Sequence, residues 1–344
     1  MSAAAVRRGP PPRGEAGRLG AARRNLARRA PTPRHQAGLT LVELMVALVI
    51  GLIVSAAAVA ALLVARSGFA AVDSTAQLRE NARFSADLIQ RLAVQAGFED
   101  AAGGRFATGL PAIQGYDDAL LNLVGLPGSL ANDSRSGGCG GFTDTSCMNG
   151  SDVLMVRFWG TSGSVPTVAD GSMINCAGIG EPEGNEQAVS IFHIVRSAAG
   201  EPTLACTYRS PVDGSWKTEA LIPGVEAFQV LYGVDSVTPG TASAVATAGT
   251  DLPPTRYLRA SQLVVAGDAP ATLNNWRRVH SLRIGLLFRG PTSTAIDKAA
   301  TAKTYNVLGA EFSGSADTLS QLAVPADGRL RQALVINIHL RNRS

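Results

Sequence analysis

One long apolar segment constrains the fold of this chain more than any other feature of its sequence. Leu44–Ala65 is a run of 22 residues without a charged residue or a proline. As an α-helix it would extend roughly 33 Å, which is enough to cross a hydrocarbon core about 30 Å thick. The apolar region of a secretory signal peptide is shorter, at about 7–15 residues. Residues 39–65 are therefore predicted to form a membrane-spanning helix.

The segment before this helix is strongly basic. Residues 1–38 contain nine Arg and one Glu, a net charge of +8, whereas the whole chain carries +4 and the remainder therefore −4. With few large apolar residues, the segment is expected to be disordered. A basic arm can bind nucleic acid, but arginines just before an apolar helix typically keep that end in the cytoplasm. We favour this topogenic role, with the C-terminus outside the cytoplasm, and the acidic remainder argues against a nucleic-acid partner.

Glu43 is the only charged residue between Leu39 and Ala65. A carboxylate within a membrane span usually marks a function, although one at the headgroup level is tolerated more easily. No Lys or Arg in the segment offers a counter-charge. A cut between Gly38 and Leu39 would supply one, because the new α-amino group would lie one helical turn from Glu43 or reach the Glu43 of an adjacent helix. A desolvated pair of this kind penalises any register that leaves one charge unpaired.

The residues around this site resemble the cleavage and methylation motif of type IV prepilins. The stretch Gly38–Ile50 reads G-LTLVELMVALVI. The resemblance implies that a prepilin peptidase cuts after Gly38 and N-methylates Leu39, and that Glu43 is the carboxylate that docks the subunit. The sequence departs from the usual pattern in two ways, since the first mature residue is Leu rather than Phe and the leader is long.

The helix is predicted to continue as an amphipathic segment over residues 66–97. On a helical wheel, apolar and small residues share one face and charged residues the other. Gln77–Asp100 resembles the region after the transmembrane helix of PilW-like minor pilins, with Arg79–Phe84 (RENARF) as its core. The resemblance implies a packing or assembly surface. An ordinary amphipathic helix with solvated Arg79 and Arg83 explains the same pattern, and we favour it for these two arginines.

Residues 98–344 are predicted to form a β-rich periplasmic domain. Apolar or alternating segments separated by Gly, Pro, Ser and Asp indicate antiparallel strands with one covered face. The amphipathic helix is the expected cover, so the predicted fold is α+β and type IV pilin-like, a long N-terminal helix packed on a C-terminal antiparallel β-sheet. The strand-like segments are Asp152–Gly160, Ala188–Arg196, Thr203–Arg209, Val225–Val234, Ser281–Arg289 and Ala333–Arg341.

The cysteines indicate disulfides rather than a metal site. All of them follow the apolar segment, none forms a C-x-x-C pair, and the His residues are scattered, so no metal or other cofactor is expected. Outside the cytoplasm such cysteines normally pair. Pairing of neighbours would join Cys139 to Cys147 and Cys176 to Cys206, although three connectivities remain open.

No catalytic constellation is present in the sequence, so the chain is not predicted to be an enzyme. The resemblance implies a minor pilin that acts in type IV pilus assembly or priming after leader cleavage and N-methylation. Its implied partners are the prepilin peptidase, other minor and major pilins bound through the N-terminal helix, the inner membrane and the pilus assembly platform. The expected location is the inner membrane as a single-pass protein with a periplasmic C-terminus, and then the pilus at the cell surface.

Three alternatives remain from the sequence. A pseudopilin of a type II secretion system would share the leader motif and the architecture. A DNA-uptake pilin at a pilus tip would need a basic patch on the folded domain, which the net charge of the remainder disfavours. A membrane-anchored enzyme would need a catalytic site that the sequence does not show.

Overall fold

A computed structural model describes most of the chain beyond Gly38. Cys139, Cys147 and the predicted leader before Gly38 lie outside the described residues. The described ranges are 38–99, 109–119, 121, 148–165, 168–184, 186–244, 253–291, 303–312 and 320–342.

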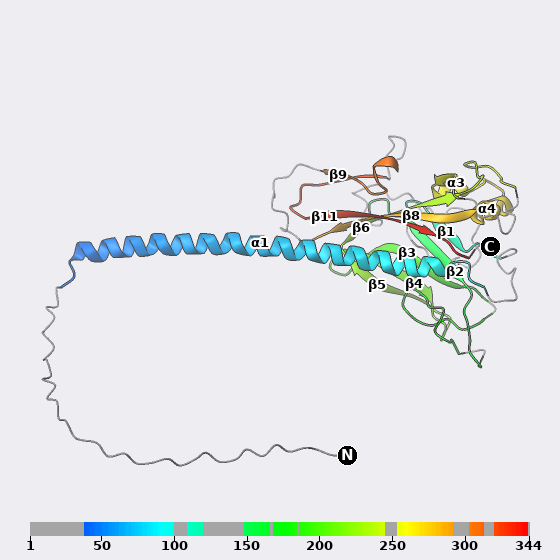
Figure 1. Cartoon of the computed structure of the whole chain (residues 1–344), viewed down its shortest axis with the longest axis horizontal. Helices are drawn as coiled ribbons and strands as arrows, with labels where there is room; N and C mark the ends of the chain where they lie inside the picture. The colour runs from blue at the N-terminus through cyan, green and yellow to red at the C-terminus, as the bar shows by residue number, and fades with distance from the viewer. Residues whose placement is uncertain are drawn as a thin grey trace, which may run out of the picture. The chain divides into compact units, whose positions relative to one another are not determined.

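One long helix precedes a series of strands with short helices between them (Figure 1). In chain order the described elements are α1 Leu41–Gln95, β1 Ile113–Tyr116, β2 Val153–Phe158, β3 Ala188–Arg196, β4 Pro202–Arg209, β5 Trp216–Pro223, β6 Val225–Val234, β7 Arg256–Leu258, α3 Ala260–Leu263, α4 Ala269–Trp276, β8 Val279–Arg289, β9 Lys303–Asn306, the 3₁₀ helix η2 Ala310–Phe312, β10 Gln321–Val324 and β11 Arg331–His339.

The helix α1 extends over 55 residues. It ends where Gly97 adopts a φ of +73°, and a Cβ at this position would lie 2.5 Å from the carbonyl oxygen of Asn342. Glycine is thus required both by the backbone conformation and by the close approach of another chain segment. The helix itself ends at Gln95, two residues before the glycine at which the sequence places its end.

The second part of α1 buries one stripe of side chains, as the sequence predicts. The charged residues of the opposite face are exposed, and Leu88 at the edge of the stripe is half-buried. Burial of each large aliphatic side chain stabilises the fold by about 1.5–3 kcal/mol. The buried residues of the helix are Ala71, Ser74, Leu78, Ala82, Ser85, Ile89, Leu92 and Ala93.

The described strands form two main antiparallel sheets rather than one. The first has five strands in the order β1-β2-β3-β4-β5, and the second has four in the order β11-β8-β6-β7. A separate pair joins β10 to β9. The fold is α+β, as the sequence predicts, but the division of the strands between sheets was not anticipated.

Gly224 is where the chain passes from the first sheet to the second. Its N–H donates to the carbonyl of Pro202 in β4 (2.8 Å), and its carbonyl accepts from the N–H of Arg289 in β8 (2.7 Å). Its φ is +79°, and a Cβ would lie 2.6 Å from the Arg289 oxygen. A single residue with access to this conformation therefore turns the chain between β5 and β6 and connects both sheets.

A second connection between the sheets comes from Asp152, just before β2. Its N–H donates to the carbonyl of Phe228 (2.8 Å), and its Oδ2 accepts from the N–H of Val230 (2.7 Å), both in β6. Arg259 Nη1 lies 3.6 Å from the same oxygen. Burial raises the pKa of Asp152, while Arg259 and the backbone donors oppose that shift. The carboxylate is used to hold the sheets together.

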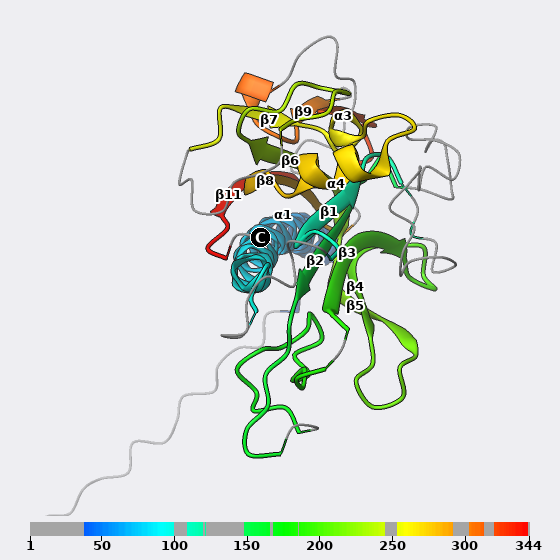
Figure 2. The same ribbon diagram turned by 90° about the vertical axis from the view of Figure 1, so that its right-hand side faces the viewer.

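One hydrophobic core contains residues of α1 and of both main sheets. Figure 2, viewed along α1, shows the helix with β8 and β11 on one side and β1–β3 on the other. The alternating residues of β8, Leu282, Ile284, Leu286 and Phe288, all lie in this core at 0% exposure, but Leu287 on the other face is also 0% exposed, in a separate apolar cluster, so both faces of β8 are covered rather than one. The helix stripe therefore occupies the space between two sheets, where it excludes water from the inner face of each.

Candidate functional site

The N-terminal end of α1 contains the residues that the sequence singles out. Gly38 and Leu39 precede the helix, and Leu39 is 78% exposed. A Cβ added to Gly38 would meet nothing within 4 Å, and its φ lies outside the left-handed region. Neither backbone conformation nor packing therefore requires a glycine at this position.

Glu43 lies in the first turn of α1, where it forms a reciprocal cap with Thr40. The backbone N–H and the hydroxyl of Thr40 both donate to Glu43 Oε2, at 2.9 and 3.0 Å. The N–H of Glu43 donates in turn to Thr40 Oγ1 at 3.3 Å. This is a capping box, in which two N–H groups of the first turn obtain partners. The sequence contains the signal for this cap as Thr-x-x-Glu, a pattern that the prediction of a docking role for Glu43 does not include.

The first half of α1 is exposed along its whole length. Every residue from Gly38 to Ala70 is exposed, including Ile50 at 56% and Leu52 at 72%. By length and composition α1 is able to cross a membrane, with a mean hydropathy of 2.8 over its most apolar 18 residues. The hydroxyl of Ser55 donates to the carbonyl of Gly51 at 2.8 Å, so this polar group also has a partner within the helix. A surface of this kind requires lipid or other apolar helices around it.

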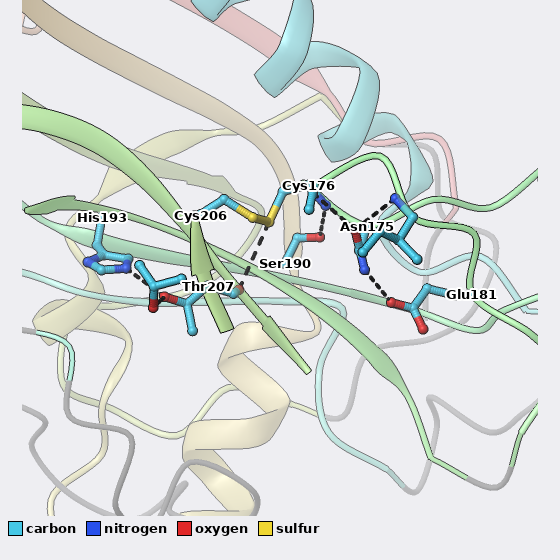
Figure 3. Close-up of a disulfide and its surroundings, with 10 residues drawn as sticks. Asn175, Cys176, Glu181, Ser190, His193, Cys206 and Thr207 are labelled. Carbon is cyan, nitrogen blue, oxygen red and sulfur yellow. Dashed lines mark hydrogen bonds between the residues drawn. A yellow bond between two sulfur atoms is a disulfide. The ribbon is translucent and has the colours of Figure 1, made fainter. Parts of the chain in front are cut away.

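The second predicted feature is the disulfide between Cys176 and Cys206 (Figure 3). It joins the connection between β2 and β3 to the middle of β4, with 6.0 Å between the Cα atoms. Cys176 N–H also donates to Ser190 Oγ at 3.0 Å. The structure thus selects one pairing among those that the sequence left open. It fastens a long connection onto the first sheet.

Two titratable side chains lie near this disulfide (Figure 3). Burial raises the pKa of Glu181 to about 7, and a hydrogen bond from Asn175 Nδ2 (2.7 Å) partly opposes the shift. Burial lowers the pKa of His193 to about 4, and its Nε2 lies 2.8 Å from Thr207 Oγ1. Asn175 Oδ1 also accepts from the N–H groups of Ala177 and Ile179, so Asn175 connects Glu181 to the turn after Cys176. No pattern in the sequence pointed to Glu181 or Asn175.

These side chains do not form a catalytic arrangement. Glu181 is hydrogen-bonded to an amide, and the hydroxyl beside His193 belongs to Thr207, which is 0% exposed and is also hydrogen-bonded to Thr218, so no substrate can reach it. Within the described ranges, no three His, Cys, Asp or Glu residues are grouped so that they could hold a metal ion. The chemistry of this region is that of a cross-linked and hydrogen-bonded scaffold.

Comparison with known proteins gives two family matches. Residues 191–342 match type IV pilus-assembly protein W, and residues 33–59 match the prokaryotic N-terminal methylation motif. The second match contains Gly38, Leu39 and Glu43. No curated protein matches the sequence.

Among solved structures, the type IV-like pilin TTHA1219 from Thermus thermophilus is similar. The two chains are 15% identical, and the match covers 78% of this chain and 98% of that chain with a TM-score of 0.37.

An exposed apolar helix with a methylation motif at its start, followed by a β-rich domain, defines a type IV pilin-like protein. Within that class, the similarity of residues 191–342 to type IV pilus-assembly protein W supports a PilW-like minor pilin. Processing by a prepilin peptidase and partners within a pilus follow in general terms from this assignment. The class is one of structural subunits.

Proposed function

We propose that this protein acts in the assembly of a type IV pilus as a minor pilin. A prepilin peptidase cuts between Gly38 and Leu39 and methylates the new α-amino group. The helix then waits in the inner membrane with its start on the cytoplasmic side and the β-rich domain in the periplasm. Domain by domain, residues 1–38 are the leader, 39–97 the helix and 98–344 the globular part.

One observation supports this proposal more than the others. The exposed apolar half of α1 begins with a single carboxylate, that of Glu43. Glu43 lies inside the stretch that matches the methylation motif. Glu43 docks the subunit by pairing with the α-amino group of a neighbouring pilin helix. In apolar surroundings an unpaired charge is penalised by several kcal/mol, so this pair selects the axial register of the subunit.

The match to pilus-assembly protein W favours a pilus over a secretion system. The methylation motif alone would fit both. Deleting the gene and comparing piliation with protein secretion separates the two: loss of pili with unchanged secretion supports the proposal, and the reverse result would assign the protein to secretion.

The N-terminal mass of the protein isolated from membranes tests the maturation step. With an active prepilin peptidase, we expect a chain that begins at Leu39 and carries one additional methyl group. Without the peptidase, we expect the intact leader. An intact leader in both strains would show that the protein is not processed as a pilin.

A pair of glycine variants makes this test specific. A Cβ at Gly38 or at Gly51 meets nothing within 4 Å, so neither Gly38→Val nor Gly51→Val introduces a clash. Gly38→Val should abolish cleavage and pilus assembly, whereas Gly51→Val should be cut normally. Equal processing of both variants would show that Gly38 is not read by the peptidase.

A further inference from the structure

The capping box at the start of α1 uses only one oxygen of the Glu43 carboxylate. Oε2 accepts both bonds from Thr40, whereas Oε1 has no hydrogen-bond partner among the described residues. Thr40 Oγ1 is 3.0 Å from Oε2 and also accepts the Glu43 N–H. The carboxylate is therefore held in one orientation and keeps one oxygen available.

All atoms of this capping box lie on the mature side of the proposed cut. Cleavage after Gly38 breaks the peptide bond between Gly38 and Leu39, and the peptide bond that carries the Thr40 N–H stays intact. The box is therefore compatible with both the precursor and the mature chain. It also requires no contribution from the new α-amino group of Leu39, which leaves that amine available to another subunit.

The apolar surroundings of the helix start make the hydrogen bonds of this capping box more important than they would be in water. The first N–H groups of a helix have no partners within the helix, and in lipid there is little water to replace them. The hydroxyl oxygen of Thr40 accepts a hydrogen bond from the N–H of Glu43, and the carboxylate of Glu43 accepts one from the N–H of Thr40. Without this arrangement, a glutamate side chain samples several rotamers, and ordering it on binding is unfavourable.

We propose that Thr40 is a positioning residue for subunit docking. It holds Oε2 of Glu43 so that Oε1 faces outward, ready for the cationic amine of a neighbouring pilin helix. Docking then adds a charge-assisted bond to a carboxylate that is already ordered. This inference rests on the proposed docking role of Glu43, and it assigns to Thr40 a part that the methylation motif itself does not.

The test compares two substitutions in the full-length protein, expressed in its host from the native locus. Thr40→Val keeps the shape of the side chain and removes the hydroxyl, whereas Thr40→Ser keeps the hydroxyl. Each variant is measured for cleavage and methylation by N-terminal mass and for incorporation by its amount in sheared pili or in cross-linked complexes with other pilins. For each variant, the amount of protein incorporated is divided by the amount that has been cleaved and methylated.

We expect Thr40→Val to incorporate about three- to tenfold less than the wild type, in the range of a lost N-cap. Thr40→Ser should incorporate nearly as well as the wild type. If valine prevents cleavage, Thr40→Asn, which is a good N-cap, and Thr40→Gln, which is a poor one, provide the same comparison. Incorporation of the capping and non-capping variants at equal levels would overturn the proposal, and so would higher incorporation without the hydroxyl.

A double variant separates positioning from helix stability. Glu43→Gln keeps an oxygen that can accept from Thr40 but lacks the charge. If Thr40 acts by orienting that charge, Thr40→Val should cause no further loss in the Glu43→Gln protein. An equal further loss in that protein would mean that Thr40 supports the helix start alone. Wild-type incorporation of Glu43→Gln would instead refute the docking role of Glu43, which is the proposed function itself.

Discussion

The two halves of α1 differ in whether their apolar side chains are buried, although both are regular helix. In the first half every apolar side chain is exposed, and Ile50 is 56% exposed. In the second half one stripe is buried between two sheets, and Ile89 is 0% exposed. What differs is the partner, because the second half finds its apolar partners within the same chain and the first half has to find them elsewhere.

The first half of α1 and the globular part also differ in how their carboxylates are paired with cations. Glu43 in the first half accepts hydrogen bonds from Thr40, but no cation of the described chain pairs with it. In the globular part, the carboxylate of Glu226 makes a bidentate contact with Arg331, and the two side chains are 2% and 3% exposed. Among the described residues, Glu226 thus has its cation within the same chain and Glu43 does not. This contrast can be tested by four measurements.

The largest effect is expected from the buried ion pair. Burial alone would lower the pKa of Arg331, but its hydrogen bonds to Asp327 and Glu226 raise it above the usual value. Arg331→Met leaves Glu226 buried without its cation and should reduce the free energy of unfolding by about 3–5 kcal/mol. Chemical denaturation of the full chain in detergent measures this.

The control for that measurement is an exposed pair. Lys217 Nζ lies 3.5 Å from Asp213, and both side chains are about half exposed. Lys217→Met should change the free energy of unfolding by less than about 0.5 kcal/mol. If Arg331→Met behaved in the same way, the globular part would not depend on its own internal charge pairs.

A matched pair of isoleucines compares the halves of α1 directly. Ile89→Ala removes buried methyl groups from the core and should destabilise the globular part by about 3–4 kcal/mol. Ile50→Ala removes the same groups from an exposed site and should leave unfolding of that part unchanged. Thermal unfolding in detergent is the measurement. A clear loss of stability in Ile50→Ala would show that the first half also packs within its own chain.

The disulfide should have a somewhat smaller effect. Cys176 and Cys206 are 30 residues apart in the sequence, and loss of the bond relaxes the unfolded chain. Replacing both by Ala should lower the free energy of unfolding by about 2–4 kcal/mol. The variant should still be cut after Gly38, because the bond lies in the globular part. Failure of cleavage in this variant would mean that maturation depends on the folded domain.

The smallest effect is a dependence on pH. The pKa of Glu181 is about 7 in the folded protein against an ordinary value of 4.5, so the folded state binds this proton more tightly. The resulting stabilisation is complete below about pH 4.5 and is lost as the pH rises through 7. The free energy of unfolding of the wild type should therefore fall by about 1–3 kcal/mol between about pH 4.5 and 7 because of this residue, and Glu181→Gln should lack this change.

The comparison of Glu181→Gln with the wild type has to allow for His193. Its pKa is lowered from 6.5 to about 4, so its contribution is present above pH 6.5 and is lost as the pH falls through 4. Because both proteins contain His193, the difference between their unfolding curves isolates Glu181. Parallel curves from pH 4 to 8 would contradict the assigned pKa.

Much of the fold was predictable because it follows from local patterns. The period of the apolar residues in α1 identified its buried face, and the alternation in β8 identified the face that packs on the main core, although the other face is covered as well. The cysteines pointed to disulfides but not to a connectivity, since pairing depends on which strands are neighbours. Thr40 was readable as the start of a Thr-x-x-Glu capping box, whereas Glu181 and Asn175 gave no signal because their environment is made by distant segments.

By itself, the sequence determined the exposed apolar helix, its single carboxylate, the stripe on its second half and the likeness to pilins, because these depend on residues close together in the chain. Only the tertiary structure decided that the strands divide into two sheets with α1 between them. That division depends on the turn at Gly224, where one positive φ connects Pro202 of one sheet to Arg289 of the other. Contacts between residues so far apart are set by how the whole chain packs, and a local pattern does not contain them.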